Sequence, residues 1–385
     1  MKTKLKKYLI LFLTLGIIAI GLYYLNLPNR HRAIIKTTLL HKLKLVDNTW
    51  NIGYTDSSTT FISPTFVVDN IYKSMEGPQA LGTFQIDPNK SELVWLNSFK
   101  ISAIGINELD SLPRDYICHS NVDYYDGEHY GKWELFDRIG KYYPRLTSMS
   151  SGIEEYKFPE GFGFPIFTDE NIFLSTQTLN HNLKNSTFSL KHKIDLGFLK
   201  HSSGMKPLIS KSLFIALPYE NEPNKIDYNS ISYNSNSCLP VDTKNHVYLN
   251  HEGKSVSGHW FIPTGRRIYR SKVTHQLNLK DSTTLHFMIP HLHPFAEKLE
   301  FRDITNDSTI FTSLAKNHID KIGLNKVSYY TSEEGYMLSP EHEYELVVYI
   351  NNTSNKIQDM MASVFAFMYD KDMAIKIPNS MQTND

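Results

Sequence analysis

Residues 283–293 read TTLHFMIPHLH and residues 298–304 read KLEFRDI, two short runs of β-branched, aromatic and aliphatic side chains. Both runs lie between residues that favour turns, and this combination is typical of β-strands. Similar runs occur at 59–72, 91–106, 171–183 and 343–354. Turn residues recur about every 8–12 positions, which is the spacing of antiparallel sandwiches. The sequence therefore predicts a mostly β protein made of antiparallel, jelly-roll-like β-sandwiches.

The length of the chain favours two domains. It has 385 residues, whereas a single hydrophobic core usually stops growing at about 250–300 residues. The polar stretch PYENEPNKIDYNSISYNSNSC at 218–238 has the composition of a linker. We therefore predict two β-sandwich domains, at 45–215 and 230–378, after an N-terminal segment at 1–30.

The N-terminal segment has the pattern of a membrane anchor. Four lysines lie within the first seven residues, and an apolar run follows from Tyr8 to Leu27. A run of about 20 residues is long enough to cross a bilayer as a helix. Aromatic residues and no small-residue cleavage site lie at its end, so we predict an uncleaved transmembrane helix. The lysine-rich end is expected in the cytoplasm, which makes the protein membrane-anchored and extracytoplasmic, on the periplasmic side.

Composition and motifs exclude several classes of function. Lys and Arg number 40, and Asp and Glu also number 40, without a basic stripe, so no nucleic-acid partner is expected. The sequence contains no Gly-rich phosphate loop, no G-x-S-x-G motif and no H-E-x-x-H motif. Nucleotide chemistry, esterase activity and zinc protease activity are therefore not predicted.

The chain has two cysteines, Cys118 and Cys238, one in each half. Three roles are consistent with this pair in an exported protein: a disulfide between the halves, two free thiols, and a thiolate that binds a metal. The cysteine count does not distinguish these roles.

Two histidines lie at the end of the predicted strand at 283–293. His291 and His293 are two positions apart, so on a strand they present both imidazoles on one face, a geometry that suits a metal ion. A pair of solvent-facing histidines is the simpler alternative. Met360 lies at a strand entrance, where packing is the usual role of a methionine. His259, beside Trp260, is a further candidate for a metal or substrate contact. The simpler interpretation of this stretch is a turn at Pro263-Thr264-Gly265 with solvated arginines, Arg266 and Arg267.

Several of these motifs together resemble one family. PHLH at 290–293 and QDMMASVFAFMY at 358–369 resemble the copper type II, ascorbate-dependent monooxygenases, which include peptidylglycine α-hydroxylating monooxygenase and dopamine β-hydroxylase. The resemblance covers roughly residues 60–370. SMEGP at 74–78, CHSN at 118–121 and HLHPFAE at 291–297 are similar to an uncharacterised bacterial branch of the family.

The resemblance implies a function. In the family, a strand with two histidines and a methionine on a later strand hold the copper that activates O2. It therefore implies that His291, His293 and Met360 bind copper and that the protein is an oxidoreductase, a copper-dependent monooxygenase. The implied reaction is hydroxylation of a C–H bond in a small-molecule or peptide substrate, with an external electron donor such as ascorbate. Asp359 stands where the family has a glutamate.

The resemblance also indicates a second metal site in the first half. Residues 115–125 and 161–182 stand where the family holds its electron-transferring copper, and His119 and His181 are the candidate ligands. Cys118 takes the place of one family histidine, so this site departs from the family pattern. The alternative function is a non-catalytic, extracytoplasmic copper-binding protein that keeps only the C-terminal site. A sandwich module without a metal is the third hypothesis.

Overall fold

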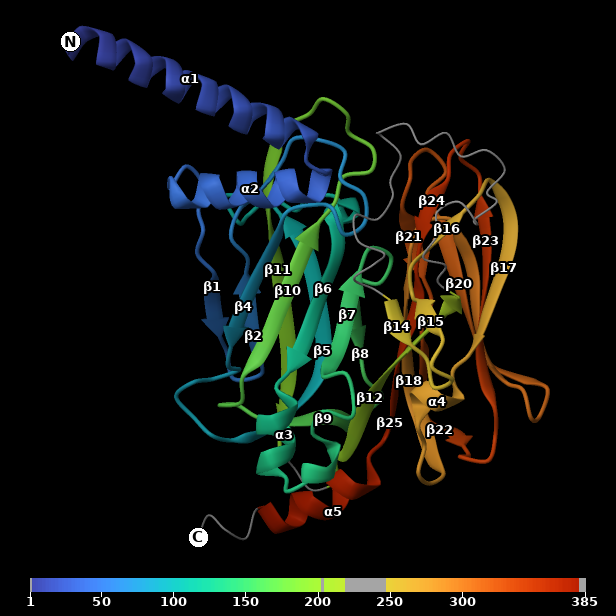
Figure 1. The fold of residues 1–385 in the computed structure, drawn as a ribbon. Helices are drawn as coiled ribbons and strands as arrows, with labels where there is room; N and C mark the ends of the chain where they lie inside the picture. The colour runs from blue at the N-terminus through green and yellow to red at the C-terminus, as the bar shows by residue number, and fades with distance from the viewer. Residues whose placement is uncertain (1, 202–203, 219–246, 381–385) are drawn as a thin grey trace.

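The computed structural model describes residues 2–201, 204–218 and 247–380 and confirms a mostly β protein with an apolar N-terminal helix (Figure 1). Two antiparallel β-sandwiches stand side by side. Helix α1 (Lys2–Asn26) projects from the first sandwich, and α2 (Asn29–Lys42) lies across one end of it. The segment Lys6–Asn26 has a mean hydropathy of 2.2 and none of it is buried, as expected of a membrane anchor or a signal sequence.

The first sandwich has two sheets that face each other across aromatic side chains. One sheet has the strand order β1 (Asn51–Tyr54), β2 (Ser58–Ile62), β11 (Phe188–Lys200), β5 (Leu93–Ile104) and β9 (Phe162–Phe167), and β3 (Phe66–Val68) and β8 (Glu155–Lys157) pair beside this path. The other sheet has the order β4 (Gln79–Phe84), β10 (Ile172–Thr178), β6 (Ile117–Tyr124) and β7 (Arg145–Ser150). The burial of β5 alternates from Ser98 to Ala103, as expected of a strand with one face on the core, whereas Val94 to Asn97 are all buried.

The second sandwich is built in the same way. One sheet has the order β12 (Lys206–Phe214), β25 (Ala362–Tyr369), β18 (Thr283–Leu292) and β22 (Tyr330–Leu338). The other has the order β17 (Gly265–Lys272), β23 (Tyr344–Asn352), β19 (Ala296–Asp303), β20 (Ser308–Asn317) and β21 (Leu324–Val327). Smaller sheets pair β16 (Trp260–Ile262) with β24 (Gln358–Met360), and β15 (Ser255–Ser257) with β13 (Leu217–Pro218) and β14 (Val247–Leu249).

The two sandwiches are continuous with each other. Strand β12 belongs to the predicted first domain, 45–215, but it pairs with β25 from Leu208 to Phe214 and with β9 only at Lys206 and Pro207. One sheet of the first sandwich, which ends at β9, and one sheet of the second, which begins at β12, therefore form a single extended sheet. The predicted boundary follows residue 215, so it assigns β12 to the first domain, although most of the pairing of this strand is with β25 of the second sandwich.

Aromatic side chains from both halves also share one core. The ring centroids of Tyr156 and Phe287 lie 5.4 Å apart, and those of Phe158 and Phe367 lie 4.6 Å apart. Such pairs each add about 0.5–1.5 kcal/mol beyond the burial of their area. Strand β7 contacts β5, β12, β18 and β25, so it packs against both halves. This shared core fixes the strand ends of the two sandwiches relative to each other.

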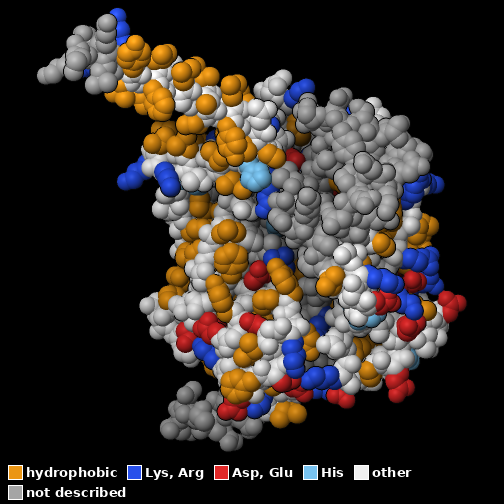
Figure 2. Space-filling view, viewed as in Figure 1, with side chains coloured by type: hydrophobic (Ala, Val, Ile, Leu, Met, Phe, Trp, Pro, Cys, Tyr) orange, Lys and Arg blue, Asp and Glu red, His pale blue; other side chains and the backbone are white. Residues whose placement is uncertain are grey.

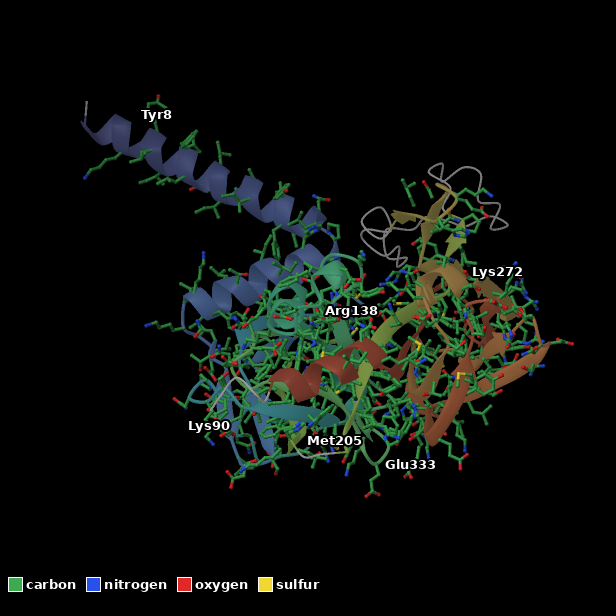
Figure 3. All side chains as sticks on the ribbon, turned by 90° about the horizontal axis from the view of Figure 1, so that it is seen from below. Tyr8, Lys90, Arg138, Met205, Lys272 and Glu333 are labelled. Atoms are coloured by element: carbon green, nitrogen blue, oxygen red, sulfur yellow. The ribbon has the colours of Figure 1, made fainter. Side chains whose placement is uncertain are left out.

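A buried ion pair reinforces the join at one end. Helix α5 (Lys371–Ser380) begins after Asp370, whose carboxylate accepts a hydrogen bond of 3.0 Å from the backbone N–H of Met373. The guanidinium of Arg138, from the first half, donates two hydrogen bonds of 2.6 and 2.8 Å to the same carboxylate. Figure 3 labels Arg138 close to α5. Both side chains are buried, so the pair ties the first half to the last helix.

A buried lysine on β12 gives a testable pH dependence. Lys211 Nζ lies 2.9 Å from the centroid of the Tyr142 ring and makes no hydrogen bond within the described part of the chain. Burial, with the charge of Arg138, lowers the pKa of Lys211 to about 7. Because the folded protein binds this proton more weakly than the unfolded chain does, stability should rise as pH increases from about 7 to about 10.

Lys211→Met is expected to raise the melting temperature more at pH 6 than at pH 10, since it removes an amine that is costly to bury when charged. Thermal unfolding at both pH values tests this. The matched control is Lys193→Met, because Lys193 is a half-exposed lysine on β11. An equal shift at pH 6 and pH 10 would contradict the assignment.

Candidate metal centre between the two sandwiches

Both histidines of the HxH motif lie at the end of β18, where this strand meets β25. His291 pairs with Ser363, and the backbone N–H of His293 donates to the carbonyl oxygen of Met361 at 3.3 Å. Their ring centroids lie 5.8 Å apart with an interplanar angle of 79°. The two side chains are 9% and 5% exposed, which excludes the solvent-facing alternative. The predicted pairing of the two imidazoles on one side of the strand agrees with this geometry.

The rings also have nitrogen atoms that the protein leaves without partners. Nδ1 of His291 is buried and makes no hydrogen bond to any described residue. A buried polar atom of this kind is uncommon and usually has an ion, a water or a chemical role. Burial lowers the pKa of His291 well below its usual range. The ring is therefore neutral at physiological pH, and neutral imidazole is the form that binds a metal.

The first sandwich brings its own candidate ligands to the same place. His119, on β6, has its ring centroid 6.3 Å from that of His291. Cys118 and His181 line the same pocket as His291 and His293. The structure thus joins two sets of residues, which the resemblance assigns to separate copper sites, in one region between the sandwiches. Burial lowers the pKa of His119 to about 3 and that of His181 to about 4, so both are neutral.

The pocket is lined by both halves of the chain. Besides Cys118 and His181, the first half contributes Ser74, Asp115, Ile117, Ser150, Ser151 and Leu179. The second half contributes Leu292, Pro294, Ile322, Gly323 and Leu324. Most of these side chains are apolar or uncharged. Polar groups that converge in a mostly apolar pocket are typical of a ligand or metal site.

Cys118 is a buried free thiol, and its Sγ lies 3.3 Å from Nδ1 of His119. Burial raises the pKa of Cys118 to about 12, so the thiol keeps its proton until a metal displaces it. Cys238 lies outside the described residues, and the disulfide between Cys118 and Cys238 stays a prediction. The position of Cys118 on the pocket wall agrees with the alternative of a soft metal ligand.

His259 belongs to the cluster as well. It directly precedes β16 and is 8% exposed, and its ring centroid lies 6.1 Å from that of His293. His259 itself is thus shielded from solvent, whereas Arg266 and Arg267 are exposed, as the simpler interpretation of this stretch expects. The sequence carries no spacing signal for this contact, because the partner strand of β16 is β24, which comes much later in the chain.

Asp359, rather than Met360, approaches the histidines. Its Oδ2 lies 2.9 Å from Nδ1 of His293, the distance of an ion pair. Burial is the largest single effect on the pKa of Asp359 and would raise it, but His293, His259 and Lys73 together outweigh burial and hold that pKa below its usual value. Histidines that bind metals commonly have a carboxylate against the nitrogen that does not bind the metal. Nε2 of His293 is therefore the atom left for an ion.

Met360 lies on the other side of strand β24. It is fully buried in the hydrophobic core and pairs with Trp260, whose ring packs 5.4 Å from Tyr269. Successive side chains of a strand point to opposite faces, so the approach of Asp359 to His293 directs Met360 away from it. The role of Met360 as a ligand stays a prediction, and the packing of this residue does not support it.

The distances between the histidine rings are compatible with the binding of one metal ion. Two imidazoles that bind one ion at about 2.0–2.1 Å have ring centroids no more than roughly 6.5 Å apart. The three neighbouring pairs, at 5.8, 6.1 and 6.3 Å, are within this limit. Within the described residues, no three His, Cys, Asp or Glu side chains already surround one ion position. A third ligand therefore requires a side-chain rotation in the cluster.

Comparison with known proteins does not assign the chain to a family. No known protein family matches the sequence, and no curated protein matches it. Among solved structures, a peptide-N(4)-(N-acetyl-β-D-glucosaminyl) asparagine amidase has a TM-score of 0.30 at 10% identity over 79% of this chain and 96% of its own. The STIV MCP gives 0.30 at 10% identity, over 82% and 98%.

The extracellular domain of ANXUR2 from Arabidopsis thaliana gives a TM-score of 0.18 at 8% identity, over 86% of this chain and 91% of its own. Similarity at these TM-scores supports no inference about fold or function. It also gives no support to the resemblance to copper monooxygenases.

Asp359→Asn is expected to weaken metal binding by about 10–100-fold, the usual effect of losing the carboxylate that orients a histidine ligand. The measurement is a competition titration of the full-length protein with a chelator of known affinity. Asp303→Asn is the matched control, because Asp303 is a buried carboxylate that lies 2.7 Å from another histidine, His342. Equal affinities for wild type and Asp359→Asn would show that Asp359 does not orient a ligand.

Proposed function

We propose that the protein binds one copper ion in the pocket between its two sandwiches, with His291 and His293 as the central ligands. The observation that carries this proposal is the pair of buried, neighbouring imidazoles, one of which has a buried nitrogen without a partner among the described residues. Neutral imidazoles and the thiol of Cys118 are suitable donors for copper, and Cu²⁺ has the highest affinity for nitrogen ligands among the common divalent metals.

The third ligand in this proposal comes from the first half of the chain. His181 lines the pocket, and His119 flanks His291. A ligand set shared by the two sandwiches makes metal binding depend on their correct docking. In this respect the proposal differs from the His-His-Met site that the resemblance implies.

The proposed activity is O2-dependent hydroxylation of a C–H bond in a small-molecule or peptide substrate, as in the copper monooxygenases that the sequence resembles. Bound copper supplies one-electron reduction of O2. The full reaction converts R–H, O2, two electrons and two protons into R–OH and water. An external donor such as ascorbate supplies the two electrons in this proposal. The chain's own residues hold the imidazole of His291 neutral, orient His293 through Asp359 and keep the pocket largely apolar.

A specific observation favours the second candidate, a non-catalytic copper-binding protein. His119 lies beside His291 and His181 lines the same pocket, so the candidate ligands of the second copper site lie in one region with those of the first. A protein with a single copper site cannot pass an electron from a second copper within the same chain. In either case we propose that the protein is anchored in the membrane by α1, with both sandwiches on the extracytoplasmic, periplasmic side, because the lysines precede the apolar helix.

One experiment separates these functions. The full-length protein in detergent is loaded with copper, freed of weakly held copper by a chelator, and assayed for bound copper and for ascorbate-dependent O2 uptake. One copper per chain with O2 uptake that is lost in His291→Ala supports the monooxygenase. One copper without O2 uptake supports the binding protein. A chain that retains no copper is a structural module, and the proposal is then wrong.

The third ligand is tested by two kinds of substitution. Met360→Leu conserves volume and removes the sulfur, so we expect its affinities for Cu(I) and Cu(II) to match those of wild type. At least one of His119→Ala and His181→Ala should weaken copper binding by more than about 10-fold. That is the lower end of the loss seen when a residue that only orients a ligand is removed. A selective loss of Cu(I) affinity in Met360→Leu would instead establish the methionine as a ligand, since Cu(I) prefers soft sulfur.

A further inference from the structure

Helix α2 follows α1 after a sharp turn. Helix α1 ends at Asn26, Pro28 precedes α2, and α2 begins at Asn29. Since only two residues separate the helices, α2 starts within a few ångströms of the end of α1. Figure 1 shows α2 running across the end of the first sandwich beneath α1. A bilayer crossed by α1 would therefore have its surface near the start of α2.

One face of α2 is fixed to the first sandwich. Ala33 and Thr37 are buried against it. Lys36 Nζ donates a hydrogen bond of 3.0 Å to the hydroxyl of Tyr72 and forms an ion pair with Asp69. His41 Nε2 lies 3.1 Å from the carbonyl oxygen of Thr65. The helix is thus part of the folded body, and its orientation follows that of the sandwich.

Exposed apolar side chains lie away from this docked face. They form a lipid face of Ile34, Ile35 and Leu39 on α2, Leu43 at its C-cap and Leu45 just after it, which are 37%, 44%, 55%, 59% and 67% exposed. The helix also exposes His31, Thr38 and Lys42. Ile35, Leu39 and Leu43 follow one another at four-residue spacing, so they share one side of the helix. Figure 2 shows hydrophobic side chains continuing from α1 onto α2. Contiguous apolar surface of this kind marks an interaction site.

The charges around the lipid face have one sign. Residues 29–46 contain five Lys or Arg and no Asp or Glu. Arg30, Arg32, Lys42 and Lys44 are the four of these outside the Lys36 ion pair. Basic residues beside an apolar helical face are typical of helices that lie in the interface of an anionic bilayer.

We propose that α2 is an interfacial helix whose lipid face inserts into the headgroup region of the bilayer that α1 crosses, with anionic phospholipid as its partner. Direct continuity with an apolar segment long enough to cross a membrane identifies the bilayer as the occupant. The docked inner face then holds the first sandwich against the membrane in one orientation. This inference does not depend on copper binding.

The test measures the depth of the lipid face in vesicles that contain the full-length protein. A nitroxide is attached to Leu39→Cys in a Cys238→Ser background, in which the buried Cys118 does not react, and its accessibility to O2 and to a water-soluble nickel chelate is measured. In vesicles with about one-third phosphatidylserine we expect a depth of about 5–10 Å below the headgroup boundary. The matched control is Leu314→Cys, because Leu314 is similarly exposed, on β20 of the second sandwich, and it should stay in water.

Charge reversal provides the second measurement. Arg30→Glu combined with Lys42→Glu and Lys44→Glu should move the nitroxide at position 39 toward water while leaving the protein in the vesicles through α1. A wild-type lipid face that is as accessible to the nickel chelate as position 314 would overturn the proposal. Broadening between nitroxides on two chains that persists at high lipid dilution would overturn it as well, because a second copy would then cover the face.

Discussion

His291→Ala is expected to raise the dissociation constant for copper by more than about 100-fold, because it removes a ligand, whereas the loss of an outer partner costs about 10–100-fold. Copper-dependent O2 uptake should disappear with it. The measurement is a chelator competition on the full-length protein for both Cu(I) and Cu(II). His293→Ala should behave in the same way, since the two rings lie 5.8 Å apart at the centre of the cluster.

His286→Gln is the matched control for this prediction. His286 is a buried histidine on the same strand, β18, and its ring nitrogens lie 2.7 Å from the hydroxyl of Thr284 and 3.0 Å from the carbonyl oxygen of Ser332. It does not line the pocket. Copper affinity should match that of wild type. If His286→Gln and His291→Ala lose copper equally, the loss reflects folding of β18, and the assignment of His291 fails.

Arg138→Met is expected to destabilise the protein by about 3–5 kcal/mol, the usual cost of leaving a buried charge without its partner. The unpaired charge is Asp370, which is 4% exposed and also caps α5. Because the pair joins the first half to the last helix, unfolding of both halves should shift together. Urea unfolding followed by far-UV circular dichroism and by tryptophan fluorescence measures the effect.

The control for this ion pair is Arg145→Met. Arg145 donates to Asp123 at 2.8 Å, but the arginine side chain is 23% exposed and the carboxylate stays in contact with water. Its loss should cost about 1 kcal/mol or less. A similar cost for both variants would show that the Arg138 pair is no more important than a surface pair. Two separate unfolding transitions would contradict the shared core.

The mostly β fold and the apolar N-terminal helix were predictable because alternation and long apolar runs are local signals. The join between the sandwiches was not, because β12 is inside the predicted first domain and its partner β25 lies about 150 residues later, so nothing local marks the pairing. Helix α2 was not predicted from the sequence. Its buried face contains Ala33 and Thr37 while Ile35 and Leu39 are exposed, so the sequence lacks the apolar stripe of a helix that packs on a core.

The candidate site was predictable to the extent that its residues lie close in sequence. His291 and His293 share a strand, so their common orientation followed from a period of two. The convergence of His119 and His181 with them depends on the docking of two sandwiches, for which a single sequence gives no signal. Asp359 and Met360 are adjacent, and only the register of β24 against β16 decides which of them faces His293.

The most direct test of the copper site is anomalous diffraction at the copper edge from crystals of the copper-loaded, full-length protein. We predict one strong peak in the pocket between the sandwiches, about 2.0–2.1 Å from an imidazole nitrogen of His291 and of His293. The peak should have a third ligand from His119 or His181. A peak at the exposed pair His251 and His275, whose rings stack 4.3 Å apart, with none in the pocket, would contradict the account.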